Sequence, residues 1–373
     1  MDQADSPLKR DIERTLLSLR GVRAVTITEG TAPRVDAVYV EPIPGLNPQQ
    51  IVEEVVAAAR DHAGVDIVSD RIHLIPGLDV RLGLGAWLSA VLTAARPRQW
   101  VKNLLVFGAP ATGGVLTQPD ALASASLAFL AFCLASSGMY FINDVVDMEE
   151  DRQHPVKRRR PIASGVLSRT AAIIIGAAAT IAAMFTAFAG GGLPLTGVVA
   201  GYVATVLTYT FFLRKIALLD LAAIAGGFLL RAIAGGVATG VPLSEWFLIV
   251  ASFGSLYLAA GKRHAEFIQL ASESGVQRAS LEQYTEPYLR YIEFSSSTIA
   301  IAAYALWAFE GAAGGTIWSA LSIIPFVLGI FRYGLLVEKG RAGAPEDAIL
   351  RDGVLLFFGA AWVMFVALGV YLS

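Results

Sequence analysis

Apolar stretches long enough to cross a membrane recur along this chain from about Leu82 onward, and they restrict its fold more than any other feature. A helix of about 20 apolar residues crosses a bilayer and satisfies its own backbone hydrogen bonds where water is absent. The sequence therefore predicts an all-α polytopic membrane protein with about nine transmembrane helices. The expected spans lie near Asn103–Thr117, Leu122–Phe141, Thr170–Phe188, Leu193–Phe212, Ala217–Val237, Trp246–Gly261, Ile292–Phe309, Ile317–Val337 and Val354–Leu372.

The composition of the chain supports this class. Of its 373 residues, 55% are hydrophobic and 16% are charged, whereas soluble domains contain about 45–50% apolar and about 25% charged residues. The net charge of −2 indicates no general affinity for nucleic acid. Any electrostatic preference must therefore come from where the charges lie.

The residues before the first apolar stretch are predicted to form a separate part of the protein. Residues 1–78 alternate between helical and strand-like patterns, which indicates a small soluble α/β domain on the cytoplasmic side. Residues 79–95, which include Trp87, are expected to be a linker helix in the membrane interface, and residues 96–373 form the membrane domain. We find no catalytic group of residues in the first domain. Docking or oligomerisation is therefore its expected role, and a homo-oligomer remains open.

Lysine and arginine gather in every second loop between the expected spans, which predicts the orientation. The intervening loops contain neither residue type. Positive loops stay on the cytoplasmic side, so we expect the N-terminus inside the cell, the C-terminus outside, and the chain in the inner (plasma) membrane. For any single basic residue, a role in topology alone remains an alternative. The basic loop residues are Arg152, Lys157, Arg158, Arg159, Arg160, Arg214, Lys215, Lys262, Arg263, Arg278, Arg290, Lys339, Arg341 and Arg351.

Three aspartates at the end of the second expected span form the main candidate site. Asp144, Asp147 and Asp151 stand at positions i, i+3 and i+7, so on a continuous helix they share one face. Converging carboxylates repel one another unless a cation compensates them, and Mg²⁺ prefers such oxygen ligands. We therefore predict a catalytic Mg²⁺ site on the cytoplasmic side, with Asn143 steering a carboxylate or binding the ligand. The alternative is an acidic helix end exposed to water.

Basic and polar residues on the same side suit an anionic substrate. Lys157, Arg158 and Arg160 follow the aspartates, and Arg98, Lys102 and Asn103 begin the first span. Lys102 is counted with the aspartates as catalytic, and the others as substrate-binding.

Charged residues in the later spans are further candidates. Arg231 lies eleven residues after Asp220 within one span, and intramembrane charges are normally functional, although the two residues could simply pair. Lys262 and Glu266 stand at i and i+4 and, with Arg263, leave the membrane on the side of the aspartates. An ordinary surface ion pair is the alternative for them.

The motif Asn143, Asp144, Asp147 and Asp151 resembles the NDxxDxxxD motif of the UbiA-type intramembrane prenyltransferase superfamily. That resemblance covers the chain from about Ala95 and implies a nine-helix bundle. Typical members carry a second motif, DxxxD, where this chain has Lys262 and Glu266. With the segments ARPRQWVKNLLVFGAP, AAGKRHAEF and QYTEPYLRYI, this departure resembles the decaprenyl-phosphate phosphoribosyltransferase branch of the superfamily.

The resemblance implies transfer of 5-phosphoribose from phosphoribosyl diphosphate to a polyprenyl (decaprenyl) phosphate, with release of diphosphate, for cell-wall arabinan synthesis. Mg²⁺ on the aspartates would hold the donor diphosphate. Lys157, Arg158, Lys262 and Arg263 would bind donor phosphates, while Arg98, Lys102 and Asn103 would receive a phosphate of donor or acceptor. Further candidates on the same side are Tyr209, Lys215, Tyr284 and Arg290.

Two other functions are consistent with a bundle of this kind. A conventional prenyltransferase would move a prenyl chain from a diphosphate to an aromatic or other acceptor, but it predicts a second acidic motif that the sequence lacks. A lipid transporter or scaffold predicts polar residues at the middle of several spans, whereas the span interiors here are mostly Ala, Leu, Ile and Gly.

Overall fold

The structure consists of two compact units, which are described separately. One unit comprises Met1–Val91 and Glu149–Ser168, and the other comprises Leu92–Met148 and Arg169–Ser373. The computed structural model of the chain describes residues 7–19, 22–29, 35–42, 48–63, 72–74, 84–154, 157–272, 283–310, 315–343 and 345–372.

The N-terminal part of the first unit is a three-stranded sheet with two helices. Strand β2 is central, pairing antiparallel with β1 and parallel with β3. The core gathers apolar side chains from both helices and all three strands, among them Ile12, Leu16, Ile27, Val38 and Val55. The elements are α1 (Pro7–Leu16), β1 (Val22–Glu29), β2 (Val35–Pro42), α2 (Pro48–Ala63) and β3 (Ile72–Leu74). The boundary expected at residue 78 stays a prediction.

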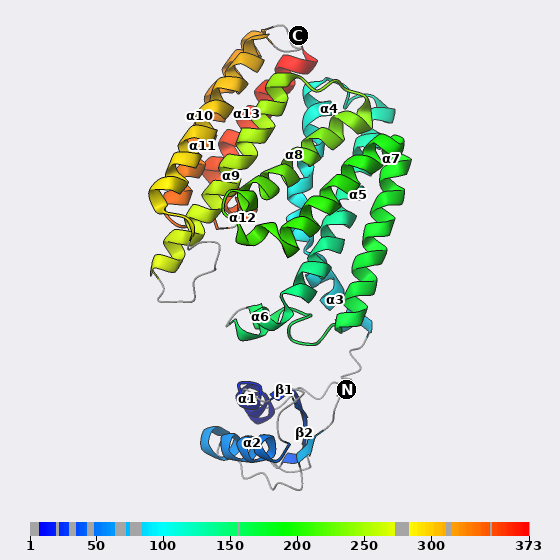
Figure 1. Ribbon diagram of the computed structural model, residues 1–373, viewed down its shortest axis with the longest axis vertical. Coiled ribbons are helices and arrows are strands. Elements are labelled where there is room, and N and C mark those ends of the chain that lie inside the picture. The colour runs from blue at the N-terminus through cyan, green and yellow to red at the C-terminus, as the bar shows by residue number, and fades with distance from the viewer. Residues whose placement is uncertain are drawn as a thin grey trace. The chain divides into compact units, whose positions relative to one another are not determined.

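The second unit, Leu92–Met148 with Arg169–Ser373, is called the membrane unit and is a bundle of long helices (Figure 1). Helices α5, α7 and α8 pack side by side, α9 follows α8, and α10, α11 and α13 complete the other side. The long helices are α5 (Pro119–Val146), α7 (Arg169–Phe211), α8 (Leu219–Thr239), α9 (Glu245–Ser272), α10 (Glu286–Glu310), α11 (Ile317–Glu338) and α13 (Gly353–Tyr371). The shorter elements of the chain are α3 (Leu84–Ala95), η2 (Pro97–Phe107), α4 (Gly108–Thr112), α6 (Met148–Gln153), η3 (Lys157–Arg159), η4 (Leu213–Lys215) and α12 (Pro345–Arg351).

Six helices of the described residues are long and apolar enough to cross a membrane: α5, α7, α8, α10, α11 and α13. Helix α7 contains a break at Gly191 and Gly192, where Gly192 has φ +62° and ψ −155°, a conformation open essentially to glycine. Two helical segments therefore flank this point, where the sequence predicted two spans. The total of nine spans stays a prediction.

The first expected span is not one α-helix, contrary to the sequence-based expectation. Pro97–Phe107 forms a 3₁₀ helix and Gly108–Thr112 a short α-helix. A 3₁₀ helix rises about 2.0 Å per residue against about 1.5 Å for an α-helix, so η2 extends farther per residue than an α-helix of the same length would. That this segment crosses the membrane stays a prediction.

Small residues let the helices of the membrane unit approach closely. A Cβ atom on Gly138 of α5 would lie 2.5 Å from the Thr180 hydroxyl and 2.8 Å from the carbonyl oxygen of Gly176, both on α7, so Gly138 has no room for a side chain. Such close packing drives helix association in a membrane, because lipid tails are as apolar as the helix side chains and the hydrophobic effect gives no net gain. Large apolar side chains such as Phe185, Leu193 and Phe294 instead point outward and are mostly exposed, as expected of a lipid-facing surface.

Candidate active site

The carboxylate of Asp144 lies buried in the last turn of α5 and is paired with Arg96. The Arg96 guanidinium donates to Oδ1 of Asp144 at 2.5 Å and lies 4.9 Å from the centre of the Tyr140 ring. Arg96 has φ +53° and ψ +60°, the left-handed region that non-glycine residues rarely adopt, and it sits just before Pro97. This turn between α3 and η2 brings the guanidinium to Asp144.

The other two motif residues of the membrane unit lie at the same end of α5. Asp147 follows the last helical residue and accepts a hydrogen bond from Arg214, which lies on η4. The side-chain oxygen of Asn143 accepts a hydrogen bond from the Thr210 hydroxyl near the end of α7. Polar contacts therefore tie the motif on α5 to the end of α7.

The three aspartates do not share one continuous helix, which corrects the expectation of a single helical face. Helix α5 ends at Val146, Asp147 has φ −87° and ψ 3°, and α6 begins at Met148. Asp151 belongs to the first compact unit, where it is buried and accepts from Arg160 at 2.6 Å. The helix break at Asp147 is a local backbone feature that residue spacing does not reveal.

A second charged network joins α7, α8 and α9 in the membrane unit. Asp220 accepts from Arg263 Nε at 2.9 Å and from the Tyr284 hydroxyl at 2.6 Å. Arg263 also donates to Glu266 at 2.8 Å and to the Tyr209 hydroxyl at 3.1 Å. Both Asp220 and Arg263 are fully buried. Four of the candidate residues, Tyr209, Arg263, Glu266 and Tyr284, are thus brought together.

Asp220 does not pair with Arg231, so that simple alternative for the two residues is wrong. Eleven residues of α-helix separate them by about 16 Å along the axis, too far for an ion pair although they share a face. Arg231 instead donates to Oδ1 of Asn103 at 2.7 Å and to the Tyr202 hydroxyl at 3.0 Å. Its guanidinium lies 4.6 Å from the centre of the Tyr202 ring and 5.6 Å from that of Phe132. Two more candidates, Asn103 and Arg231, therefore meet inside the bundle.

The remaining candidates lie nearer the surface. Lys262 is partly exposed, with its amine 3.8 Å from Glu266, and Arg290 pairs with Glu286 and Glu338. Lys102 is half-buried on η2. Arg98, Lys215 and Arg158 are exposed, and Lys157 is half-buried. None of these placements tests a role in binding, so these roles stay proposals.

The sequence placed Arg96 among the basic residues expected to face phosphate and Arg214 in a basic loop, but it did not predict that either one pairs with an aspartate of the motif. Each contacts an aspartate of the motif. The available signal was their position, because both lie at span ends on the side of the aspartates. Spacing along the chain does not show which basic residue lies opposite which carboxylate.

Oxygen atoms at the end of α5 suit a hard divalent cation. Within the described residues, no three His, Cys, Asp or Glu side chains converge as an all-protein metal site would require. Mg²⁺ usually binds through one or two carboxylates and completes its shell with water and substrate phosphate. The carboxylates of Asp144 and Asp147, with the Asn143 amide beside them, fit that kind of site.

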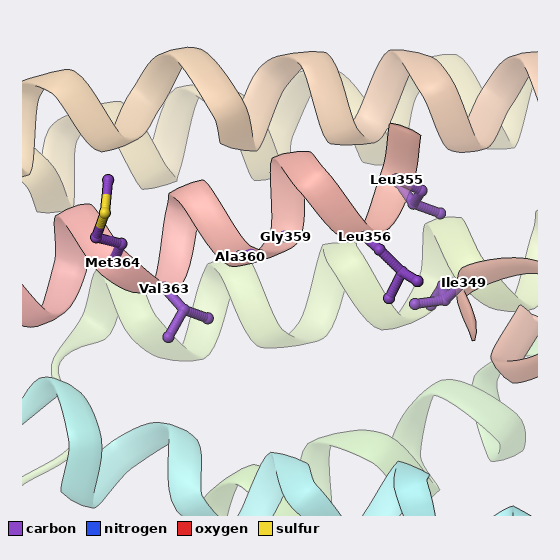
Figure 2. Close-up of a pocket in the computed structure, with 7 residues that line it drawn as sticks. All are labelled: Ile349, Leu355, Leu356, Gly359, Ala360, Val363 and Met364. Atoms are coloured by element: carbon purple, nitrogen blue, oxygen red, sulfur yellow. The ribbon is translucent and has the colours of Figure 1, made fainter. Parts of the chain in front are cut away.

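An apolar groove of about 470 Å³ runs along α13. Figure 2 shows Leu356 and Val363 projecting from one side of this helix, with Ile349 of α12 beside Leu356. All its lining residues are apolar, and they are Ile349, Leu355, Leu356, Gly359, Ala360, Val363 and Met364. The groove is suited to a hydrocarbon chain rather than to a charged ligand.

Comparison with known proteins identifies the family. The sequence profile of the UbiA prenyltransferase family matches residues 104–368. The chain belongs to this family. The resemblance drawn from the aspartate motif is thereby confirmed, and the UbiA match takes in the described part of the bundle from η2 to α13.

Relatives within the UbiA family share much of the sequence. The chain is 42% identical over 300 residues to a decaprenyl-phosphate phosphoribosyltransferase of Mycolicibacterium smegmatis, covering 77% of this chain and 94% of the relative. A protein of the same name from Mycobacterium tuberculosis is 45% identical over 295 residues, covering 76% and 95%. One from Corynebacterium glutamicum is 40% identical over 288 residues, covering 76% and 87%.

Solved UbiA structures share the fold. A UbiA homolog from Archaeoglobus fulgidus bound to GPP and Mg²⁺ superposes with a TM-score of 0.58 at 18% identity, covering 75% of this chain and 98% of that one. A digeranylgeranylglyceryl phosphate synthase gives a TM-score of 0.53 at 16% identity, covering 77% and 99%. The all-α polytopic membrane fold expected from the sequence is confirmed.

Proposed function

We propose that this protein transfers 5-phosphoribose from phosphoribosyl diphosphate to a polyprenyl phosphate, with decaprenyl phosphate as the natural acceptor. Identity of 40–45% to three proteins named for this activity, over 87–95% of their lengths, carries the proposal. The chemistry at the end of α5 is consistent with it, because carboxylates and arginines meet there as a metal-bound diphosphate requires.

The motif Asp144, Asp147 and Asp151 is proposed to hold Mg²⁺ on the donor diphosphate. When bound, the metal would supply positive charge that stabilises the leaving diphosphate. Arg96 and Arg214 already contact the first two aspartates and can donate to phosphate oxygens from there. Their side chains are about 30% exposed, so an anion from the aqueous side can reach them.

The reaction exchanges one bond at C1 of ribose for another. The C1–O bond to diphosphate breaks with its electron pair leaving on the diphosphate, and an oxygen of the lipid phosphate forms the new C1–O bond. That oxygen is already anionic at neutral pH, so the protein does not need to supply a strong base. Holding donor and acceptor in line should therefore account for most of the rate enhancement.

The acceptor needs an apolar path for its chain and a polar site for its head. The groove along α13 is proposed to take part of the polyprenyl chain, because every side chain that lines it is apolar. Arg98, Lys102 and Asn103 on η2 are proposed to receive a phosphate of the donor or the acceptor. Asn143, Tyr209, Lys215, Arg231 and Glu266 are proposed as further substrate-binding residues, and Lys157, Arg158, Arg160, Lys262 and Arg263 as ligands of donor phosphates.

The location and pathway follow from the substrates. Phosphoribosyl diphosphate is water-soluble and cytosolic, so we propose that the end of α5 faces the cytoplasm in the inner membrane, with the C-terminus outside. The lipid-linked phosphoribose would then serve cell-wall arabinan synthesis.

The test is a transfer assay with the purified full chain and Mg²⁺. One mixture contains labelled phosphoribosyl diphosphate and decaprenyl phosphate, and the other contains a labelled prenyl diphosphate and an aromatic acid. We expect label in lipid in the first mixture. Asp144→Asn should abolish that transfer, while Asp120→Asn, on the exposed first turn of the same helix, should retain it. Product in the second mixture only would overturn the proposal.

A further inference from the structure

Each motif aspartate of the membrane unit is held by an arginine from a different segment. Arg96 reaches Asp144 from the turn before η2, and Arg214 reaches Asp147 from η4. The Asp144 side chain is only 3% exposed, whereas both arginine side chains are about 30% exposed. The carboxylate is therefore fixed in place while its cationic partner remains open to an anion from outside.

We propose that Arg96 and Arg214 compete with a divalent cation for Asp144 and Asp147, so that the metal and a diphosphate bind cooperatively. The inference rests on the proposed function for the nature of the donor. A diphosphate gives both guanidinium groups another anion to bind, and this releases carboxylate oxygens to the metal. Neither the metal nor the diphosphate alone satisfies all the charges of the site.

Electrostatic repulsion between the two cations determines whether removal of an arginine raises or lowers the affinity for metal. Mg²⁺ and similar ions need direct contact with a carboxylate oxygen at about 2.0–2.1 Å. Arg96 already occupies Oδ1 of Asp144 at 2.5 Å, and a second cation near that oxygen repels the first. Removing an arginine should therefore strengthen binding of a metal offered alone, by about tenfold for a partly exposed pair. A purely structural arginine gives the opposite sign, because its loss lets the carboxylate move.

The backbone at Arg96 supports a specific role for its guanidinium. A left-handed conformation costs a non-glycine residue about 1–2 kcal/mol, and glycine at the same position would avoid that cost. Such conformations persist where the surrounding structure over-determines them, often at ligand sites. The Tyr140 ring also holds the guanidinium 4.9 Å from its centre, so the charge stays close to the aspartate when it changes partner.

The test measures Mn²⁺ binding to the purified full chain by electron paramagnetic resonance of the free ion, without phosphoribosyl diphosphate or lipid. Arg96→Gln and Arg214→Gln should each bind Mn²⁺ about tenfold more tightly than wild type. Inorganic diphosphate should tighten Mn²⁺ binding in wild type and do so less in both variants. Arg96→Lys and Arg214→Lys keep the charge and should stay near wild type.

The matched control is an arginine–aspartate pair elsewhere in the membrane unit. Arg332 donates to both oxygens of Asp352, at 3.0 and 2.7 Å, and this contact lowers the pKa of Asp352 to about 2. The carboxylate therefore stays charged throughout the assay. Arg332→Gln should leave Mn²⁺ affinity unchanged.

Unchanged or weaker Mn²⁺ binding in Arg96→Gln and Arg214→Gln would overturn the inference. So would equal tightening by diphosphate in wild type and variants. If a glutamine variant does not fold, the lysine variants serve as the test. They must then match wild type both in Mn²⁺ affinity and in the tightening of that affinity by diphosphate. Since no transfer is measured, failure of the proposed reaction and failure of this competition are separate results.

Discussion

Replacing Asp220 by alanine tests the buried charge network around Arg263. Asp220 is fully buried and accepts from Arg263 at 2.9 Å and from Tyr284 at 2.6 Å. Removing one partner of a buried ion pair costs about 3–5 kcal/mol, because the other charge is left uncompensated. Glu266 remains 2.8 Å from Arg263 as a second counter-charge. We therefore expect the lower end of that range, about 3 kcal/mol.

A loss of this size is measurable as a change in Tm. Each kcal/mol shifts the Tm of a larger chain by about 2–4 °C, so Asp220→Ala should lower it by about 6–12 °C. The assay heats purified protein in detergent and measures the fraction that remains monodisperse by size-exclusion chromatography. The Tyr284 hydroxyl donates to Asp220 and accepts from the Leu218 N–H. Tyr284→Phe therefore removes two hydrogen bonds, worth about 1 kcal/mol each, but keeps the ion pair, and its smaller loss of Tm is the reference.

A double variant separates the charge from the packing. Asp220→Ala combined with Arg263→Met removes both buried charges, so it should be more stable than Asp220→Ala alone. A Tm for Asp220→Ala no lower than that of Tyr284→Phe would refute the reasoning. A double variant less stable than either single variant would also refute it.

Three further outcomes are expected. Gly235→Ala should lower the Tm, because its Cβ would lie 1.8 Å from the carbonyl oxygen of Val106, and overpacking costs about 1–3 kcal/mol or more. Gly226→Ala on the same helix is the control: its Cβ would have no neighbouring atom within 4 Å, so the Tm should not change. Thr210→Val should reduce kcat about tenfold with little change in Tm, because it removes the hydroxyl that donates to the Asn143 side chain. An unchanged kcat would argue against a role for Asn143. Chelation of divalent metal should abolish transfer and Mn²⁺ should restore it, measured as label entering lipid; transfer that persists in excess chelator would contradict the metal proposal.

The membrane fold and the place of the main candidate site were predictable from sequence alone. Span length depends on bilayer thickness, so apolar runs locate helices such as α11 and α13 to within one residue at each end. The position of Asp144 and Asp147 after an apolar run predicted that both lie at the end of one helix, and they lie in the last turn of α5 and directly after it. The break after Val146 was not predictable, because acidic residues alone do not show where a helix ends.

The first span shows a different limit. Its apolar run predicted a short helix, and the structure has a 3₁₀ helix at Pro97–Phe107 instead of one α-helix. Gly235 on α8 lies directly against the backbone of Val106 in that segment. This close approach depends on how two helices pack, which single-helix propensity does not describe.

What the sequence determined by itself was the class of protein, the family motif and the end of the bundle where charges gather. Only the tertiary structure decided the charge pairs, which join residues far apart in the chain: Arg96 with Asp144 over 48 positions, Arg214 with Asp147 over 67, and Arg263 with Asp220 over 43. Periodicity places residues on the face of one helix. Which residue on a neighbouring helix lies opposite that face depends on how the helices are rotated and packed against each other. That is a property of the whole bundle.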